Sequence, residues 1–275
     1  MTCKYLPKKI TNNLIKDIYY LSFSKKIIPF ETLILPSGLL SITFNYNNYR
    51  EVTFKSEKMI LKGLFITGQF NRSYNYKVVN TGESLGISLH PTTLYKILKT
   101  DISKLTNKHV SLKNFSLFLY NHLAPIFTST ETSTREKGYI LEQKIEELTN
   151  NFIDKDVVYI DKIIDLIIKK EGLLDVNEIL TIIPFSQKSL ETKFKKIIGI
   201  TPGKYLKLYR FITLMKKYNN QSIKINDLVY MYDYYDYSHF SKDFKLFMNQ
   251  SPKSYFKNES EFITTYLNKK DNKFL

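Results

Sequence analysis

The sequence predicts an α+β protein, in which a β-rich N-terminal domain with a helical tail precedes an all-α C-terminal domain. Three observations support this fold class. Short apolar segments typical of strands occupy residues 25–90, helical spacing of apolar residues begins after Pro91, and every segment after Asp156 has a helical pattern. The length of 275 residues suits two domains.

The composition is that of a folded, basic protein. Apolar residues make up 43% of the chain, and Lys plus Arg exceed Asp plus Glu by 41 to 26. The single Cys3 excludes an intrachain disulfide, and the four histidines lack metal-ligand spacing, so we expect no metal and no cofactor. Apolar runs are too short for a membrane span, and residues 1–10 lack the apolar core of a secretory signal. We therefore expect a cytoplasmic, bacterial-style protein that binds an acidic partner and no membrane.

Six extended segments are predicted in the N-terminal region. Each is rich in β-branched and aromatic residues, and turn signals such as Pro36-Ser37-Gly38 and Asn45 to Asn48 separate them. The segments are 32–35, 39–45, 51–54, 61–67, 74–79 and 85–89. The aromatic residues within and between them, such as Phe44, Phe54, Phe65 and Tyr76, either fill a core or line a pocket for a small molecule, and both interpretations stay open.

The helical tail leads to a predicted domain boundary. Helical spacing occurs in 94–98 and 112–122, and residues 136–150 predict a polar amphipathic helix. Residues 128–134 contain no apolar side chain and predict a loop. We place a regulatory, sensor or dimerisation domain at 1–150, a second domain at 154–260 and a C-terminal tail at 261–275.

The second domain begins with a predicted pair of short helices. Apolar residues at helical spacing after Asp175 end at Pro184, which breaks the helix. Ser186 is a suitable N-cap for a second helix over 186–198, and Gly199 suits its C-terminus. Two short helices with a tight turn outline a helix-turn-helix unit.

The same pattern occurs again further along the chain. Apolar residues from Ile225 to Tyr232 predict a first helix, Asp236 is the next N-cap, and a second helix covers 236–248. A helix over 202–218 joins the two units and would hold their second helices at a fixed separation. Such a pair could enter successive major-groove segments, which lie ~34 Å apart.

At these positions the chain resembles a known family. SQKSLETKFK (186–195) and GITPGKYL (199–206) resemble the first half of an AraC/XylS-type DNA-binding domain, and DYSHFSKDFK (236–245) with SPKSY (251–255) resembles its second half. The resemblance covers 156–257 and implies a transcription regulator. The family usually has a small residue in each first helix and glycine in each turn. Leu180, Pro184, Val229 and Asp233 stand there in this chain, so we expect altered crossing angles within an unchanged fold.

The N-terminal region has a resemblance of its own. PSG (36–38), GISLHP (86–91) and LTNKHV (105–110) resemble an uncharacterised domain that precedes the DNA-binding domain in some AraC-type regulators. This resemblance implies a β-rich regulatory domain and no particular ligand.

Twelve residues are the predicted DNA contacts. Between Ser186 and Lys217 the chain has nine Lys or Arg and one acid, an excess sharper than that of the whole sequence. Lys195, Lys204 and Lys245 are expected at phosphates, and Gln187, Lys188, Glu191 and Thr192 at bases. The twelve residues are Ser186, Gln187, Lys188, Glu191, Thr192, Lys195, Lys204, Tyr237, Ser238, Ser241, Lys242 and Lys245.

The leading hypothesis is a sequence-specific regulator that binds double-stranded DNA. A non-specific or architectural nucleic-acid-binding protein is the alternative, because the N-terminal region is basic as well. An enzyme is not expected: Ser238 and His239 are adjacent on one helix without an acidic partner, and no phosphate-binding glycine loop follows a strand. RNA polymerase, a small-molecule effector in the N-terminal domain and a second copy of the chain stay open as further partners.

Overall fold

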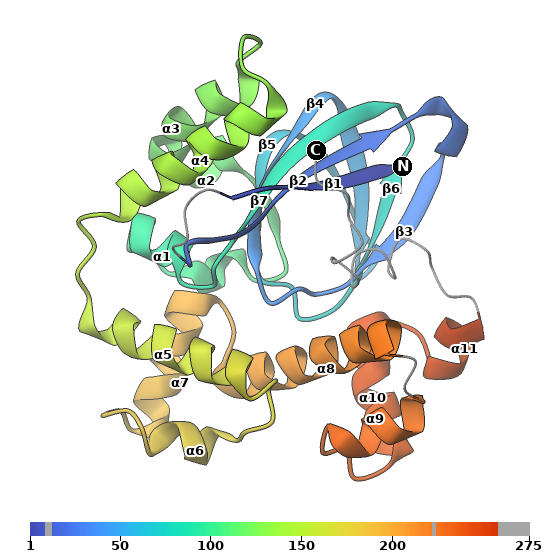
Figure 1. The fold of residues 1–275 in the computed structure, drawn as a ribbon, viewed down its shortest axis with the longest axis vertical. Helices are drawn as coiled ribbons and strands as arrows, with labels where there is room; N and C mark the ends of the chain where they lie inside the picture. The colour runs from blue at the N-terminus through green and yellow to red at the C-terminus, as the bar shows by residue number, and fades with distance from the viewer. Residues whose placement is uncertain (9–12, 222–223, 258–275) are drawn as a thin grey trace.

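The fold consists of a β-barrel, a helical cover on one side of it, and a helical domain across one end (Figure 1). The structure is a computed structural model that describes residues 1–8, 13–221 and 224–257. The predicted C-terminal tail, 261–275, lies outside the described residues. The α+β class and the order of the two parts are as predicted.

Eight antiparallel strands form the curved sheet of the barrel. The order is β1-β2-β7-β4-β5-β8, and β6 pairs with both β3 and β4. The described strands are β1 (Thr2–Leu6), β2 (Ile15–Phe23), β3 (Phe30–Ile34), β4 (Leu40–Phe54), β5 (Glu57–Thr67), β6 (Tyr74–Val78), β7 (Gly82–Leu89) and β8 (His109–Ser111).

Two details of this sheet differ from the prediction. Asn45 to Asn48 are not a turn, because β4 runs through them as a bulge in which the pairing jumps from Asn45 opposite Gly63 to Tyr49 opposite Lys62. The sheet also begins before residue 25. In β2 the pairing with β7 shifts after Ile15, which interrupts the alternation of buried and exposed residues expected of a strand. Among the described strands, β1 is a short edge strand that pairs with β2 alone. Cys3 accordingly lies in a paired strand.

The helices lie where the apolar spacing predicts them, with small shifts at their ends. The predicted segment 112–122 is divided at Ser116, which ends one helix and caps the next. The helical segments are η1 (Lys25–Ile27), α1 (Thr93–Leu98), η2 (Ile102–Leu105), α2 (Leu112–Phe115), α3 (Leu117–Thr128), α4 (Thr134–Thr149), α5 (Lys155–Lys169), α6 (Val176–Leu180), α7 (Gln187–Ile198), α8 (Pro202–Gln221), α9 (Ile225–Met231), α10 (Tyr237–Met248) and α11 (Pro252–Lys257).

The helix α4 connects the barrel to the rest of the chain. A capping box of Ser133 and Glu136 fixes its start. Gly138 lets it approach the barrel closely, since an added Cβ would lie 3.4 Å from Leu6 and 3.6 Å from Ile18. After α4, residues 150–154 lead into α5, where Asp161 bonds to Thr92 Oγ1 (2.6 Å) and to Lys96 Nζ (2.7 Å) beside the barrel. In addition, one continuous cluster of buried apolar residues extends from the barrel into the helical domain.

A tight crossing closes the end of β5. The chain at Gly68 passes so close to η2 that an added Cβ would lie 1.9 Å from the carbonyl oxygen of Leu105. Position 68 therefore requires glycine because a side chain would clash with the backbone of Leu105, and not because its backbone adopts a positive φ. Gly203, in the first turn of α8, has no neighbouring atom within 4 Å of such a Cβ.

We expect Gly68→Ala to lower the free energy of unfolding by about 2 kcal/mol or more, because backbone must move to admit the methyl group. Gly203→Ala is the matched control and should be neutral or stabilising by up to about 1 kcal/mol, since alanine favours helix. Urea denaturation of both variants measures this difference. Equal stability of the two variants would contradict the close approach at Gly68.

The barrel buries a histidine with a single side-chain hydrogen bond. His109 is 5% exposed, and its Nδ1 lies 2.9 Å from Thr67 Oγ1. Burial lowers the pKa of His109 to about 4, because the charged form would lose its hydration. His109 is therefore neutral at pH 7.

This pKa predicts an acid-sensitive stability. Between pH 6.5 and 4 the unfolded chain binds a proton at His109 that the folded chain does not, so the free energy of unfolding should fall over this interval, by up to about 3 kcal/mol from this group. In His109→Gln that part of the pH dependence should disappear, while His122→Gln, at the surface of α3, should retain it. Chemical denaturation at several pH values tests the difference, and parallel profiles for the wild type and His109→Gln would contradict it.

Candidate nucleic-acid interface

The first candidate reading helix is α7, and its ends are fixed by local capping. Ser186 Oγ accepts the backbone N–H of Ser189 at 3.3 Å, and Gly199 closes the helix with φ of +107°. Leu190 and Phe194 lie fully buried on the inner face. The observed range matches the predicted 186–198 with Ser186 as its cap.

The polar face of α7 lies at the surface. All six predicted contact residues between Ser186 and Lys195 are exposed. Three of these side chains form bonds within the helix: Thr192 Oγ1 donates to the carbonyl of Lys188 at 2.9 Å, and Gln187 Nε2 donates to Glu191 Oε1 at 3.3 Å. Lys188 and Lys195 extend from the same face.

The second candidate reading helix, α10, repeats this construction. Asp236 Oδ1 accepts the N–H of His239 at 2.6 Å, and Asn249 ends the helix with φ of +56°. Its buried side chains are Phe240, Asp243, Phe244, Phe247 and Met248. Of the predicted contacts, Tyr237, Ser238, Lys242 and Lys245 are exposed and Ser241 is half-buried.

The lysines of the interface divide into two groups. Lys193 forms an ion pair with Asp156, and Lys196 lies over the ring of Tyr95 at 5.8 Å. The five predicted DNA-contacting lysines, by contrast, make no ion pair with any residue that the structure describes. These five are Lys188, Lys195, Lys204, Lys242 and Lys245. Their charge is therefore available to phosphates.

The helix α8 separates the two units. It has 20 residues, which corresponds to about 30 Å, and the two units lie towards its two ends (Figure 1). Lys204 is exposed in its first turn, on the side of the first unit.

The turns tolerate the departures from the family pattern in different ways. Asp233 adopts the left-handed conformation that glycine would supply, with φ of +52°. In the first unit α6 already ends at Leu180, and Pro184 lies in the connection to α7. Both units keep their two helices, as expected.

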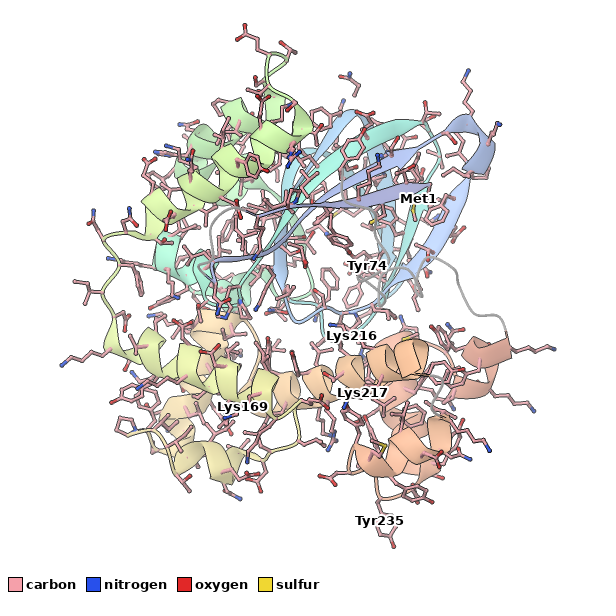
Figure 2. The ribbon with its side chains drawn as sticks, in the orientation of Figure 1. Met1, Tyr74, Lys169, Lys216, Lys217 and Tyr235 are labelled. Atoms are coloured by element: carbon pink, nitrogen blue, oxygen red, sulfur yellow. The ribbon has the colours of Figure 1, made fainter. Side chains whose placement is uncertain are left out.

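The structure adds two aromatic residues to the surface of the second unit. Tyr230 is 68% exposed and Tyr235 is 90% exposed, and Tyr235 projects away from the barrel (Figure 2). Tyr232 and Tyr234, which lie between them in the sequence, are buried instead, at 1% and 2% exposed.

Other kinds of site have no support within the described residues. No group of three or more His, Cys, Asp or Glu side chains in that part of the chain is placed to hold a metal ion. None of the described helices is both long and apolar enough to cross a membrane.

Comparisons with known proteins match both parts of the chain. A family described as a helix-turn-helix domain matches residues 181–258, and a domain of unknown function, DUF6597, matches residues 3–111. No curated protein sequence matches the chain.

Solved structures with some similarity include two of ToxT from Vibrio cholerae. One is 13% identical and covers 87% of this chain and 97% of that chain with a TM-score of 0.46. The other, bound to an unsaturated fatty acid, is 14% identical and covers 92% and 93% with a TM-score of 0.43. The AraC-like transcriptional activator CuxR is 13% identical and covers 73% and 74%, with a TM-score of 0.28.

The family matches agree with both resemblances found in the sequence. The chain contains an AraC-type helix-turn-helix domain at 181–258, and a DUF6597 domain at 3–111 precedes it.

Proposed function

We propose that the protein binds a specific site on double-stranded DNA by inserting α7 and α10 into successive major-groove segments. The observation that carries this proposal is the pair of capped helices at the two ends of α8, each with a buried apolar face and an exposed polar face. A helix of this kind fits the major groove with its polar side chains at base edges.

The residues divide by expected role. The lysines that lack ion pairs provide salt-dependent affinity through phosphates. Gln187, Lys188, Glu191 and Thr192 on α7, and Ser238 and Lys242 on α10, are the proposed contacts to bases. Ser186 and Asp236 cap their helices, so their side-chain oxygens already accept backbone N–H groups. We assign the barrel and its helical cover, 1–150, to regulation, and 154–260 to DNA binding.

The test of sequence specificity is selection of DNA from a random pool with the full chain. We expect one bipartite motif whose half-sites are separated by about one helical turn. At one fixed salt concentration, affinity for that motif should exceed affinity for random DNA by ~10³ or more. Salt-sensitive binding without a motif would instead establish the non-specific alternative, which the net charge of +15 supports.

We expect substitutions of individual lysines to separate base contacts from phosphate contacts. Lys188→Ala and Lys242→Ala should weaken binding to the selected site more than binding to random DNA, because they remove contacts to bases. Lys204→Ala should weaken both about equally and reduce the salt slope by ~1, because it removes one phosphate contact.

Fluorescence anisotropy over a salt series measures both effects. Lys169→Ala, at the end of α5, is a control that should change neither affinity by more than about twofold. Unchanged affinities in Lys188→Ala and Lys242→Ala would show that these faces do not read DNA.

A further inference from the structure

The two candidate reading helices differ in charge. Residues 186–198 contain four lysines and one acidic residue, whereas the segment of equal length at 236–248 contains two lysines and two acidic residues. Attraction to phosphates is therefore stronger at the first unit than at the second. A second unit that enters the major groove as well needs another source of affinity.

Exposed apolar side chains gather on the second unit instead. Tyr230 and Met231, at the end of α9, are 68% and 53% exposed, and Tyr237, in the first turn of α10, is 44% exposed. Within 186–198, a range that the structure describes in full, no large apolar side chain is exposed. A cluster of exposed apolar side chains is typical of a surface that contacts a partner.

Two of these side chains border a hollow in the surface between α9 and α10. Asn226, Val229, Tyr230 and Tyr237 line this hollow. Val229 is 1% exposed and contributes an apolar wall. Tyr237 packs on the buried Phe240 with ring centres 5.7 Å apart. The core of the unit thus holds the Tyr237 ring in place, so little side-chain freedom is lost when a partner binds.

The hollow adjoins the predicted DNA contacts of α10. Ser238 follows Tyr237 directly, and Lys242 and Lys245 lie one and two turns further along the helix, all exposed. In a helix-turn-helix unit the first helix crosses the DNA backbone, and the N-terminal residues of the second helix contact base edges. Tyr237 is the first residue of α10, so its ring would meet base edges in the groove.

A thymine methyl group is the apolar feature of the major groove. All four bases present hydrogen-bonding groups there, and thymine adds a methyl group, which apolar side chains contact. A phosphate would gain little from the hollow, because the four side chains that line it carry no positive charge. The chemistry of the hollow therefore fits a thymine methyl group.

We propose that the second unit reads thymine through its methyl group, which enters the hollow between Tyr230 and Tyr237. The first unit, with its polar face, reads its half-site by hydrogen bonds. The two half-sites then differ in chemistry and give the whole site a direction. This inference names the class of DNA that the protein takes, and it rests on the proposed function.

The first experiment removes single methyl groups from the selected DNA. Deoxyuridine replaces each thymine in turn, which keeps the base pairing and every hydrogen-bonding group. We expect about fourfold weaker binding of the full chain, by fluorescence anisotropy, at one or more thymines of one half-site, because one buried methyl group is lost. At the same position 5-methylcytosine should bind about fourfold more tightly than cytosine, since it restores the methyl group.

Substitutions in the hollow identify the side chains that contact the methyl group. Tyr237→Ser and Tyr230→Ser should reduce the ratio of thymine to uracil affinity at that position from about four to about one. Tyr237→Phe keeps the ring and should retain the ratio. Tyr235→Ser is the matched control, because its ring is 90% exposed and does not line the hollow, and it should retain the ratio as well. All three tyrosines are at least 44% exposed, so the substitutions leave the core in place.

Two results would overturn the inference and leave the proposed function standing. One is sequence-specific binding in which no thymine shows a dependence on its methyl group, which would assign the hollow to a protein partner. The other is a methyl dependence that Tyr230→Ser and Tyr237→Ser do not change, or that Tyr235→Ser abolishes. Such a result would place the thymine contact elsewhere on the protein.

A comparison of simple duplexes separates the inference from the proposed function. Alternating duplexes of adenine with thymine and of adenine with uracil differ in the methyl group, and they require no selected motif. Suppose that the chain selects no motif. Tighter binding of the thymine duplex, abolished in Tyr230→Ser and Tyr237→Ser, would then support the methyl contact and refute the bipartite site alone. Equal binding of the two duplexes by such a chain would overturn both.

Discussion

The positions of both candidate reading helices depend on the packing of α8. Phe194 of α7 meets Tyr205 near the start of α8 with ring centres 5.7 Å apart, and Phe244 and Phe247 of α10 meet Phe211 at 5.6 and 4.9 Å. These rings are buried, so a change in either contact opens a cavity or forces a clash. A helix is stiff over this length, and the separation of the two units follows from where their aromatic residues meet it.

The same helix also ties the two units to the barrel. Tyr205, which packs on α7, donates through its hydroxyl to the carbonyl of Gly38, in the connection between β3 and β4. The C-terminal ends of α7 and α10 bond to barrel loops, whereas their N-terminal ends and polar faces point to solvent. This arrangement suits a DNA-binding domain. The N-terminal ends, which would enter a groove, are accessible to solvent, and the C-terminal ends are fixed to the barrel by hydrogen bonds.

A polar side chain without a partner costs little free energy in the helical domain and more in the barrel. The lysines without ion pairs are exposed and hydrated, so they cost little in the absence of a partner. His109 Nε2 in the barrel is buried, and an absent partner is costly there. The interface is therefore marked by its exposed charge, whereas the barrel contains a buried ring nitrogen without a hydrogen-bond partner among the described residues.

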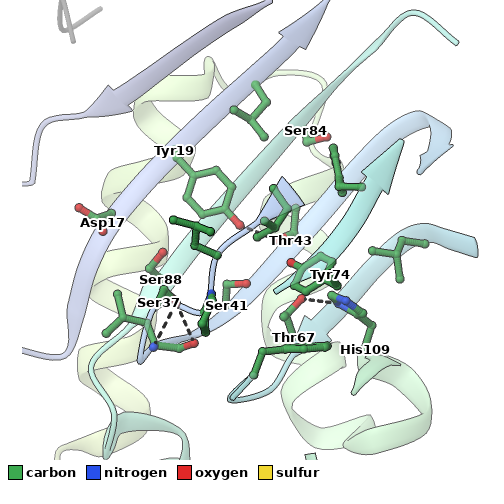
Figure 3. Close-up of a pocket in the computed structure, with 18 of the residues that line it drawn as sticks. Asp17, Tyr19, Ser37, Ser41, Thr43, Thr67, Tyr74, Ser84, Ser88 and His109 are labelled. Atoms are coloured by element: carbon green, nitrogen blue, oxygen red, sulfur yellow. Dashed lines mark hydrogen bonds between the residues drawn. The ribbon is translucent and has the colours of Figure 1, made fainter. Parts of the chain in front are cut away.

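The helices of the C-terminal domain could be predicted from the sequence, because their limits depend on local chemistry. Ser186, Gly199, Asp236 and Asn249 fix α7 and α10 within a residue of the predicted ranges, and the exposed face follows from the helical period. Most strands between residues 30 and 89 were also predictable from their alternation. Tertiary structure decided the rest. The β4 bulge and the edge strand β1 depend on partners far along the chain, and the environment of His109 depends on Thr67, Phe70 and Tyr74 meeting it in space (Figure 3). Such contacts leave no short-range pattern, because strand pairing and loop packing are set by the whole barrel.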